Sequence, residues 1–335
     1  MSTRKTNVNI FLRNPNKLGN FSLEIFYNEL YKELVKSVNL KIINVPYKNR
    51  GIFGRIYNII FCYFNQTDVN HIVGDIAYCS LLMKKKKLVI TILDCVSLYG
   101  KNDIKKTLLK YFLYSMPVKR ASQVITISEA TKFDVEKFLN KKFYNSTVIP
   151  VTVSSTFFSK KIKQSNTRFN NRFLMLGTAP NKNIERVSQA LEGINGELHI
   201  IGKLSKSQKN QLLKSKIKFI EYSYPLTEEE IVHQYSLTDI LIFPSILEGF
   251  GMPIIEGNLM NVPVITSEIS SMPYVAGNSA ILVNPFSISS IRDGINSIIN
   301  DKKLRDNLII LGKKNSKRFT IKKISSQHLN VYNKI

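Results

Sequence analysis

Two glutamates on either side of a glycine-rich turn are the residues of this sequence best suited to chemistry. Glu248 and Glu256 bracket the stretch EGFGMPIIE, which directly follows the apolar run DILIFP. The apolar run is typical of a buried strand, and a proline just after the glycines is favoured in the first turn of a helix. The backbone N–H groups around Phe250, Gly251 and Met252 would then lie at a helix N-terminus, where unpaired amides bind anions such as a diphosphate.

The two carboxylates are expected to act differently. Glu256 would lie about one turn inside the helix, where it can accept hydrogen bonds from vicinal hydroxyl groups such as those of a ribose. Glu248 would precede the turn and lie nearer the middle of the site. Glutamates are also common in the first turn of ordinary helices, because the helix dipole favours negative charge there. The strand, the glycines and the proline together favour a binding site over that plainer explanation.

Short β-branched runs alternate with amphipathic helical stretches along the chain. Such alternation predicts parallel sheets with helices on both faces. Strands are expected in the first half at 8–12, 41–47, 69–73, 87–94, 123–128 and 146–151, and in the second half at 172–177, 197–203, 217–222, 239–244, 262–266 and 280–284. Helices are expected at 22–37, 128–141, 183–194 and 228–237.

A polar and basic stretch without clear periodicity separates the two series, and we interpret it as a linker. The prediction is an α/β protein with two Rossmann-like doubly wound domains that face each other across a cleft. The first domain would span 1–150, the linker 151–167 and the second domain 168–317. Ligands of such sheets bind beyond the carboxyl ends of the strands, so the cleft is the expected site.

The second half of the chain resembles a known family. The stretch FPSILEGFGMPIIEGNLMNVPVITSEISSMPYVAGNSAILVNP at 243–285 resembles the signature of the family-four retaining glycosyltransferases of the GT-B type. FLMLGTAPNKNIERVSQAL at 173–191 and LHIIGK at 198–203 extend the resemblance. VITISEATKFDVEKFL at 124–139 and NPNKLGNFSLEIFYNEL within the first 30 residues extend it more loosely into the first half. It implies the GT-B fold, with a C-terminal helix at 318–335 packed back on the first domain.

Carried to the matching positions, the resemblance implies a donor site in the second domain. Lys182 would neutralise the departing diphosphate, Glu248 would contact the donor sugar and the distal phosphate, and Glu256 would hold the nucleotide ribose. The other donor-binding residues would be Phe250, Gly251 and Met252 through their backbone, Gly177, Thr178 and Asn183, Gly202 and Lys203, Tyr222 near the base, and Gly19 from the first domain. The sugar nucleotide, linked to uridine or guanosine diphosphate, is a substrate, and no cofactor is expected.

The sequence contains no D-x-D pair, so no metal is expected on the diphosphate, in agreement with the family's metal-independent mechanism. The chain departs from the family pattern at three positions. Asn181 stands where an arginine is common, Leu93 where a histidine is frequent, and Tyr274 where an acidic residue is frequent. In the first domain, Asp94 and His71 are candidates for contact with the acceptor or the donor sugar. A lone histidine such as His71 is more often a structural residue.

The 335 residues carry a formal net charge of +24, most of it in the first half. Residues 1–165 contain 27 Lys and Arg against 10 Asp and Glu. This surplus favours a polyanionic partner, but a composition rich in Lys, Asn and Ile throughout would also produce it. The basic amphipathic stretch 102–120 could lie on an anionic membrane or simply cover the sheet. Nucleic acid is not an expected partner, because no recognition motif occurs.

Cysteine usage and hydropathy indicate the cellular compartment of the protein. The chain has three cysteines without a CxxC pair, no secretory signal, and no apolar window long enough to span a bilayer. We therefore expect a cytoplasmic protein, with the inner face of the cell membrane as a second location.

These observations and the resemblance predict a retaining hexosyltransferase. It would move a sugar from a nucleotide diphosphate sugar to a hydroxyl of a saccharide or lipid-linked saccharide, in the assembly of a bacterial surface polysaccharide or lipid-linked glycan. Two alternatives remain open. One is a sugar-nucleotide-binding protein without catalysis. The other is a glycoside hydrolase, which also uses two carboxylates but requires both to flank one glycosidic bond.

Overall fold

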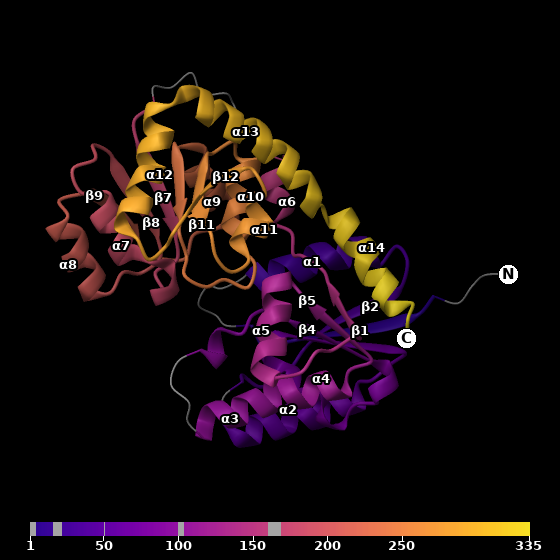
Figure 1. Cartoon of the computed structure of the whole chain (residues 1–335). Helices are drawn as coiled ribbons and strands as arrows, with labels where there is room; N and C mark the ends of the chain where they lie inside the picture. Colours follow the sequence, from indigo (N-terminus) through magenta and orange to yellow (C-terminus); the bar gives the residue numbers. More distant parts are fainter. Residues whose placement is uncertain (1–4, 16–21, 50, 100–103, 160–168) are drawn as a thin grey trace. The chain divides into compact units, whose positions relative to one another are not determined.

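The computed structural model describes residues 5–15, 22–49, 51–99, 104–159 and 169–335. Its contacts divide the chain into two compact units (Figure 1). The first unit contains Met1–Thr152 together with Thr320–Ile335, and the second contains Val153–Phe319. The chain thus leaves the first unit once, builds the second, and returns to the first for its final segment.

The first unit is built on a parallel sheet with strand order β2-β1-β3-β4-β5-β6. Its strands are β1 (Asn7–Leu12), β2 (Asn39–Asn44), β3 (Val69–Val73), β4 (Leu88–Ile92), β5 (Gln123–Thr126) and β6 (Ser146–Val148). Its α-helices are α1 (Ser22–Leu34), α2 (Ile52–Phe64), α3 (Ile104–Lys110), α4 (Met116–Arg120), α5 (Glu129–Leu139) and α14 (Ile321–Tyr332). Short 3-10 helices are η1 (Gly74–Leu82), η2 (Lys85–Lys87) and η3 (Val96–Leu98), and a π-helical turn η4 (Tyr111–Ser115) joins α3 to α4.

The second unit is built on a parallel sheet with strand order β12-β11-β10-β7-β8-β9. Its strands are β7 (Arg172–Leu176), β8 (Glu197–Ile201), β9 (Lys218–Tyr222), β10 (Ile240–Phe243), β11 (Val264–Ser267) and β12 (Ala280–Val283). Its α-helices are α6 (Ser155–Ser159), α7 (Ile184–Ala190), α8 (Lys206–Lys214), α9 (Glu228–Ser236), α10 (Met252–Leu259), α11 (Met272–Ala276), α12 (Ile288–Asn300) and α13 (Lys302–Ser316). The 3-10 helices are η5 (Pro180–Lys182) and η6 (Lys317–Phe319).

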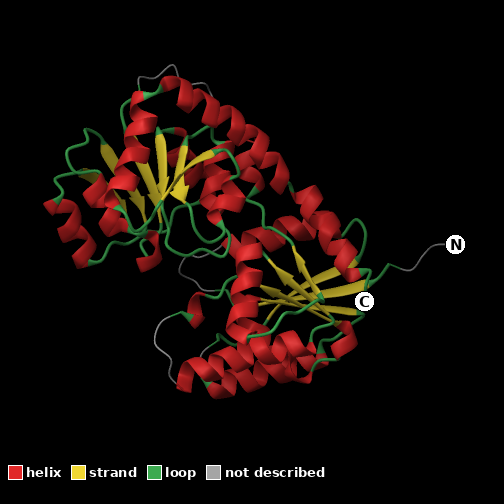
Figure 2. Ribbon diagram, in the orientation of Figure 1, coloured by secondary structure: helices red, strands yellow, loops and turns green. Residues whose placement is uncertain are grey.

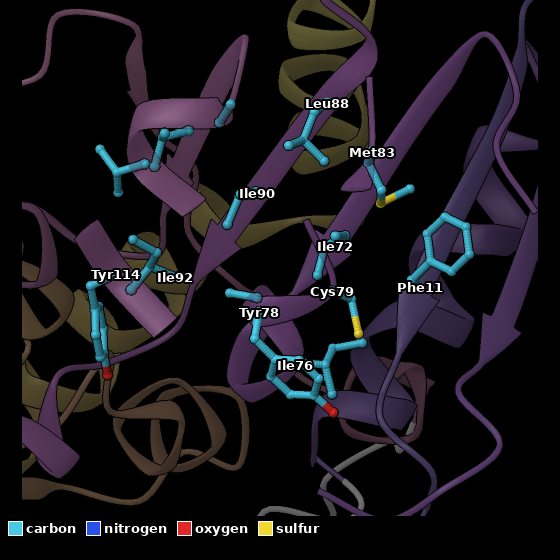
Figure 3. Packing of buried hydrophobic residues seen from close by; sticks show 14 of the residues in the cluster. Phe11, Ile72, Ile76, Tyr78, Cys79, Met83, Leu88, Ile90, Ile92 and Tyr114 are labelled. Carbon is cyan, nitrogen blue, oxygen red and sulfur yellow. The ribbon is translucent and has the colours of Figure 1, made fainter. Parts of the chain in front are cut away.

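The central strands of both sheets are buried on both faces, as near-continuous apolar runs require. Every residue of β3, β4, β10 and β11 is buried, and helices cover the sheets (Figure 2). Figure 3 shows how Phe11, Ile72 and Ile90 from three neighbouring strands pack with Cys79 of η1 in one core. The predicted α/β class with two doubly wound, Rossmann-like units is confirmed.

The segment predicted as a linker at 151–167 is partly a packed element of the second unit. Val153 and Phe157 are buried, and α6 packs against α9 and α10. The hydroxyl of Ser154 donates a hydrogen bond of 2.6 Å to the carboxylate of Glu228. The rest of the predicted linker lies outside the described residues. The described part of this segment up to Ser159 therefore packs on the second unit, because its apolar and hydroxyl side chains find partners on α9 that lie far away in the sequence.

Helix α2 was not predicted from the apolar pattern. Its sequence, IFGRIYNIIFCYF, carries apolar residues around most of the helix, so it has no distinct polar face. Only Asn58 and Cys62 are buried, and most of its other side chains point to solvent. Among the residues that the structure describes, no helix is long and apolar enough to cross a bilayer.

A buried cluster of aromatic and histidine side chains joins α14 to the sheet of the first unit. The ring nitrogens of His71 on β3 form hydrogen bonds with the hydroxyl of Tyr332 on α14, at 2.8 Å, and with the hydroxyl of Thr91 on β4, at 2.6 Å. The ring of His328 lies 6.0 Å from that of His71. Burial lowers the pKa of His71 well below its ordinary value, with repulsion from His328 as a second cause, and burial lowers the pKa of His328 to about 4. Both histidines are therefore neutral when the unit is folded at pH 7.

We predict that α14 loosens as the pH falls from 7 to 5. The unfolded chain protonates these histidines near their ordinary pKa of about 6.5, whereas the folded unit protonates His328 only near 4. The free energy of unfolding is therefore at its full value above pH 6.5 and decreases toward pH 4. The loss at pH 5 from His328 alone is about 2 kcal/mol. Hydrogen exchange of peptides covering 321–332, corrected for intrinsic rates, should show weaker protection at pH 5. His328→Gln should reduce this pH dependence, while replacement of the exposed His233 should not. An identical pH response in His328→Gln would contradict the prediction.

Candidate functional site

The candidate site residues of the second unit gather at the carboxyl edge of its sheet. Strand β7 is central: the chain continues from it to β8 and β9 on one side and later to β10, β11 and β12 on the other. The loops that follow β7 and β10 therefore diverge, and such a switch point is where open α/β sheets bind ligands. Gly177 and Thr178 follow β7, Gly202 follows β8, and Glu248 lies in the loop after β10.

The loop after β10 leads into α10 as the sequence predicts. Gly251 is the N-cap residue, with a φ of 109°, a left-handed conformation that suits glycine, and it offers no side chain to cap the first-turn amides. Met252 and Pro253 begin the helix. The Phe250 side chain is buried and packs edge-to-face with Phe319 at 5.5 Å, so Phe250 can offer only its backbone to a ligand. This geometry is that of an anion-binding helix N-terminus.

Lys182 and Glu248, the two predicted catalytic residues, form an ion pair. Lys182 Nζ lies 2.6 Å from Glu248 Oε1, with 20% and 16% of the two side chains exposed. The ammonium also lies 4.9 Å from the centre of the Phe243 ring. Gly177 makes this position accessible: its φ is 84°, and a Cβ there would come within 3.0 Å of Lys182 Cε. This ion pair thus links the loop after β7 to the loop after β10.

Polar side chains that we did not predict hold the Glu248 loop. The Asn181 side-chain amide donates to the Leu247 carbonyl at 2.8 Å and to Glu248 Oε1 at 3.2 Å. Ser270 donates its hydroxyl to the Glu248 carbonyl at 2.9 Å, and Ser271 donates to the Phe250 carbonyl at 2.7 Å. Asn181, which stands where the family commonly has an arginine, therefore fixes the position of the carboxylate. The consecutive serines after β11 are the sequence feature that could have indicated these hydrogen bonds.

Glu256 is the most buried carboxylate of the site. Its side chain accepts a hydrogen bond of 2.7 Å from the hydroxyl of Tyr235 on α9. Burial raises the pKa of Glu256 to about 7, and the Tyr235 hydrogen bond and the Lys182 charge oppose that rise in part. Tyr235 itself packs edge-to-face with Phe157 at 5.6 Å. Sequence reasoning missed Tyr235, because its partner lies 21 residues further along the chain and no local pattern connects them.

The remaining predicted loops of the second unit are linked to one another. The Thr178 hydroxyl donates to the Lys203 carbonyl at 2.7 Å, and the Gly202 N–H donates to the Tyr222 carbonyl at 3.0 Å. The Tyr222 hydroxyl lies 3.0 Å from a ring nitrogen of His199. The carboxyl ends of β7, β8 and β9 are thus brought side by side, although the Tyr222 carbonyl already has a partner within the protein.

Asn183 must be reassigned from donor contact to structure. It is 1% exposed, and its side-chain amide donates to the carbonyls of Pro244 and Pro285 at 3.2 and 2.6 Å. Its side-chain oxygen accepts a hydrogen bond of 3.0 Å from Arg186. Because every polar atom of this side chain is engaged, Asn183 holds three loops together rather than facing a ligand.

The candidate residues of the first unit have different environments. His71 is fully buried with both ring nitrogens hydrogen-bonded, so it is a core residue and the prediction of sugar contact is corrected. Asp94 is exposed after β4, and its carboxylate accepts from the Val96 N–H at 3.0 Å. Leu93 packs close to Gly74, where a Cβ would lie 2.9 Å from Leu93 Cδ1. Gly19 lies outside the described residues.

Two further observations concern charge and metal chemistry. Arg318 places its guanidinium 4.8 Å from the ring centre of Tyr274, which stands where an acidic residue is frequent in the family, and donates to the Tyr274 carbonyl at 3.0 Å. Within the described parts of the chain, no group of three or more His, Cys, Asp and Glu residues is arranged to hold a metal ion.

Comparisons with known proteins agree with this geometry. Residues 158–315 match the family model described as glycosyl transferases group 1. The O-antigen chain mannosyltransferase RfbU of Salmonella typhimurium is 31% identical over 62% of this chain and 60% of its own length. The O-antigen chain mannosyltransferase B of Escherichia coli is 28% identical over 34% of this chain and 30% of its own length. The chain thus aligns with less than two thirds of each of these relatives.

Solved structures share the fold over nearly the whole chain. Sucrose-phosphate synthase from Thermosynechococcus elongatus superposes with a TM-score of 0.80 at 14% identity, covering 98% of both chains. WaaG, a glycosyltransferase involved in lipopolysaccharide biosynthesis, superposes with a TM-score of 0.74 at 14% identity, covering 97% of this chain and 99% of WaaG. At such low identity these likenesses concern the fold, and they confirm the GT-B class.

We predict that Glu256→Gln stabilises the protein at alkaline pH. The carboxyl group of Glu256 has a pKa of about 7 in the folded chain and its ordinary value of 4.5 in the unfolded chain. The folded chain is therefore most stable, as far as this group is concerned, below pH 4.5, and it loses that stability as the pH rises through 7. At pH 8 the folded chain holds a buried carboxylate, and glutamine removes that cost of up to ~3 kcal/mol. Thermal unfolding should show a higher melting temperature for Glu256→Gln at pH 8 and a smaller difference at pH 5. The exposed Glu229→Gln is the matched control on α9, and a lower melting temperature for Glu256→Gln at pH 8 would refute the prediction.

Proposed function

We propose that this chain, whose residues 158–315 belong to the glycosyl transferases group 1 family, transfers a hexose from a nucleotide diphosphate sugar to a hydroxyl group of an acceptor. One observation carries the proposal. The Lys182–Glu248 ion pair lies at the carboxyl edge of a doubly wound sheet, with Glu248 three residues before Gly251, the N-cap residue of α10. A cation near helix amides suits a diphosphate, and a neighbouring carboxylate suits the hydroxyls of a sugar.

Mannose is the donor sugar that we propose to test first. Two curated relatives are named O-antigen chain mannosyltransferases, which supports a mannosyl donor and a saccharide acceptor of a bacterial surface polysaccharide. The acceptor would be a saccharide or a lipid-linked saccharide. Since these relatives align with only part of this chain, donor and acceptor are proposals that rest on their names and on the chemistry of the site.

The proposed reaction retains the configuration of the anomeric carbon. The bond between that carbon and the donor phosphate oxygen breaks, and a bond to the acceptor oxygen forms on the same face. The acceptor proton passes to the departing phosphate oxygen, so no protein nucleophile is required. Negative charge grows on the diphosphate, where Lys182 and the first-turn amides of α10 would stabilise it in a site positioned in advance.

Glu248 has two proposed roles. Its carboxylate holds the Lys182 ammonium at 2.6 Å, and Asn181 and Ser270 hold the Glu248 loop in turn. When a diphosphate neutralises Lys182, the Glu248 carboxylate can accept hydrogen bonds from the donor sugar instead. The Glu248 carboxylate thus balances the charge of a largely buried ammonium group. A lysine at this position without that partner would carry an unpaired buried charge.

Glu256 is proposed to bind the ribose hydroxyls of the donor. The ionised carboxylate can accept hydrogen bonds from both ribose hydroxyls. The neutral acid carries a proton on one oxygen, and that oxygen then accepts less well. Because burial raises the pKa of Glu256 to about 7, we expect nucleotide affinity to increase between pH 6 and pH 8. The site would need no metal, because Lys182 and the helix amides supply positive charge to the diphosphate.

Binding of nucleoside diphosphates is the first test. A thermal-shift panel of uridine, guanosine and adenosine diphosphates, with and without a linked hexose, should raise the melting temperature for one base. The increase should persist in EDTA, be larger at pH 8 than at pH 6, and be lost in Glu256→Ala. If no nucleotide raises the melting temperature at millimolar concentration, the proposal is wrong.

Catalysis is tested with variants of the ion pair. Lys182→Ala and Glu248→Gln should each lower the rate of donor turnover about 10²-fold or more, because each removes a group aimed at charge or hydroxyls of the reacting donor. Lys314→Ala, an exposed lysine on α13, is the matched control. Wild-type protein that binds the sugar nucleotide without transfer or hydrolysis would favour the sugar-nucleotide-binding alternative.

The stereochemical outcome separates the proposed transferase from other classes. Proton NMR of the first product formed should show the anomeric configuration of the donor. Turnover of an aryl glycoside without any effect of nucleoside diphosphate would instead favour a glycoside hydrolase. The structure argues against that alternative, because Glu248 is paired with Lys182 and Glu256 is buried against Tyr235.

A further inference from the structure

The outward face of α2 is apolar, the reverse of an ordinary surface helix. Phe53 is 89% exposed, Phe64 77% and Ile52 73%. The other exposed apolar side chains of this helix are Ile56, Tyr57, Ile60 and Tyr63. Their spacing at 52/53, 56/57, 60 and 63/64 repeats with the helical period, so these seven residues form one continuous stripe. Only Arg55 is charged in the thirteen residues of α2.

Neighbouring elements enlarge this apolar face. Helix α2 packs along η1, and η1 packs against η4 and α4. Figure 1 shows α2, α3 and α4 on the same side of the first unit's sheet. Five more apolar side chains of these elements are exposed: Leu81 and Leu82 on η1, Leu108 on α3, and Tyr111 and Phe112 on η4. We call the stripe and these five residues the α2 face. Isolated apolar residues on a surface are common, but a patch of this size marks an interaction site.

Basic residues border the α2 face. Lys84, Lys85 and Lys86 are exposed and follow η1 directly. Lys106 and Lys110 lie on α3, next to its exposed apolar residues. The segment 48–120 contains 13 Lys and Arg against four Asp and Glu. An apolar face within a positive border is complementary to a lipid surface that carries negative head groups.

The same charges argue against a second copy of this chain as the occupant. A face-to-face pair of α2 faces would bring the lysine clusters of both copies together, and such like-charge contacts oppose association. The tyrosines are also informative, since Tyr57, Tyr63 and Tyr111 have amphipathic rings of the kind enriched at membrane–water interfaces. With thirteen residues, α2 is too short to cross a bilayer and would lie in the plane of the interface.

We propose that the α2 face docks the first unit on an anionic lipid bilayer, with Phe53 and Phe64 inserted among the acyl chains and the lysines on the head groups. This inference deepens the proposed function, because a lipid-linked acceptor is presented at such a surface. The sequence pattern had pointed only to the stretch 102–120, whereas the structure places the most exposed apolar residues on α2. Docking does not depend on catalysis, so the two proposals can fail separately.

Co-sedimentation of the full chain with vesicles tests the proposal. Wild type should bind phosphatidylglycerol-containing vesicles at least tenfold more tightly than pure phosphatidylcholine vesicles, and binding should weaken with salt. Phe53→Ser combined with Phe64→Ser should lower vesicle affinity at least tenfold. Lys84→Gln, Lys85→Gln and Lys86→Gln combined should reduce the preference for anionic lipid. Matched controls are Phe133→Ser on α5 and Ile310→Ser on α13, which are 65% and 66% exposed and do not belong to the α2 face, and both should bind as wild type does.

Other results would overturn the docking proposal. Absence of binding to anionic vesicles would do so, as would equal losses in the control variants. Sedimentation velocity without lipid should show a monomer. A dimer that Phe53→Ser and Phe64→Ser convert to a monomer, without any vesicle affinity in wild type, would identify a second copy as the occupant and reject the lipid surface. The nucleotide thermal shift, measured on the same variants, should be unchanged. Vesicle binding that persists in a chain without any nucleotide response would leave docking supported and the proposed function rejected.

Discussion

The ion pair between Lys182 and Glu248 connects two loops that the sheet topology drives apart. Strands β7 and β10 are neighbours, but the chain leaves them in opposite directions, and the charges meet where the two loops come together. Gly177 leaves room for the lysine stem, while Asn181 donates a hydrogen bond to the same carboxylate oxygen that Lys182 contacts. Because both side chains are largely withdrawn from water, the desolvation of the two charges offsets much of their attraction, so the pair contributes little net stability. Its importance lies in placing an ammonium, with its charge compensated, beside the start of a helix.

Two features of this molecule work against its own stability, and both lie where binding is proposed. Glu256 is buried deeply enough for its carboxyl pKa to rise to about 7, although a neutral side chain of similar shape would fit there without that cost. Helix α2 leaves Phe53 and Phe64 in solvent, although their burial would stabilise the first unit. Local departures from stable design of this kind are expected where a ligand or a surface supplies the missing partner.

The parts of the site that could be predicted are those encoded within one short stretch. The strand, the glycines and the proline around Glu248 and Glu256 specify a strand, a loop and a helix start, and the structure has all three. Contacts between distant segments could not be predicted. Tyr235 on α9 meets Glu256 on α10 although 21 residues separate them, and both helices contact α6. His71 becomes a core residue because Tyr332 arrives from 261 residues later. The α2 sequence was ambiguous for a different reason, since an apolar helix without a polar face gives no periodic signal.

The return of the chain to its first unit has a consequence for how the protein is made. A ribosome releases the first unit's sheet long before it has translated residues 320–335, so the pocket around His71 must wait for Tyr332 while the entire second unit emerges. During that interval the nascent first unit lacks α14, which packs against α1 in the finished fold. A chaperone or a nearby bilayer would meet the growing polypeptide in this half-finished state, and a premature stop codon before residue 320 would damage the half that was synthesised first.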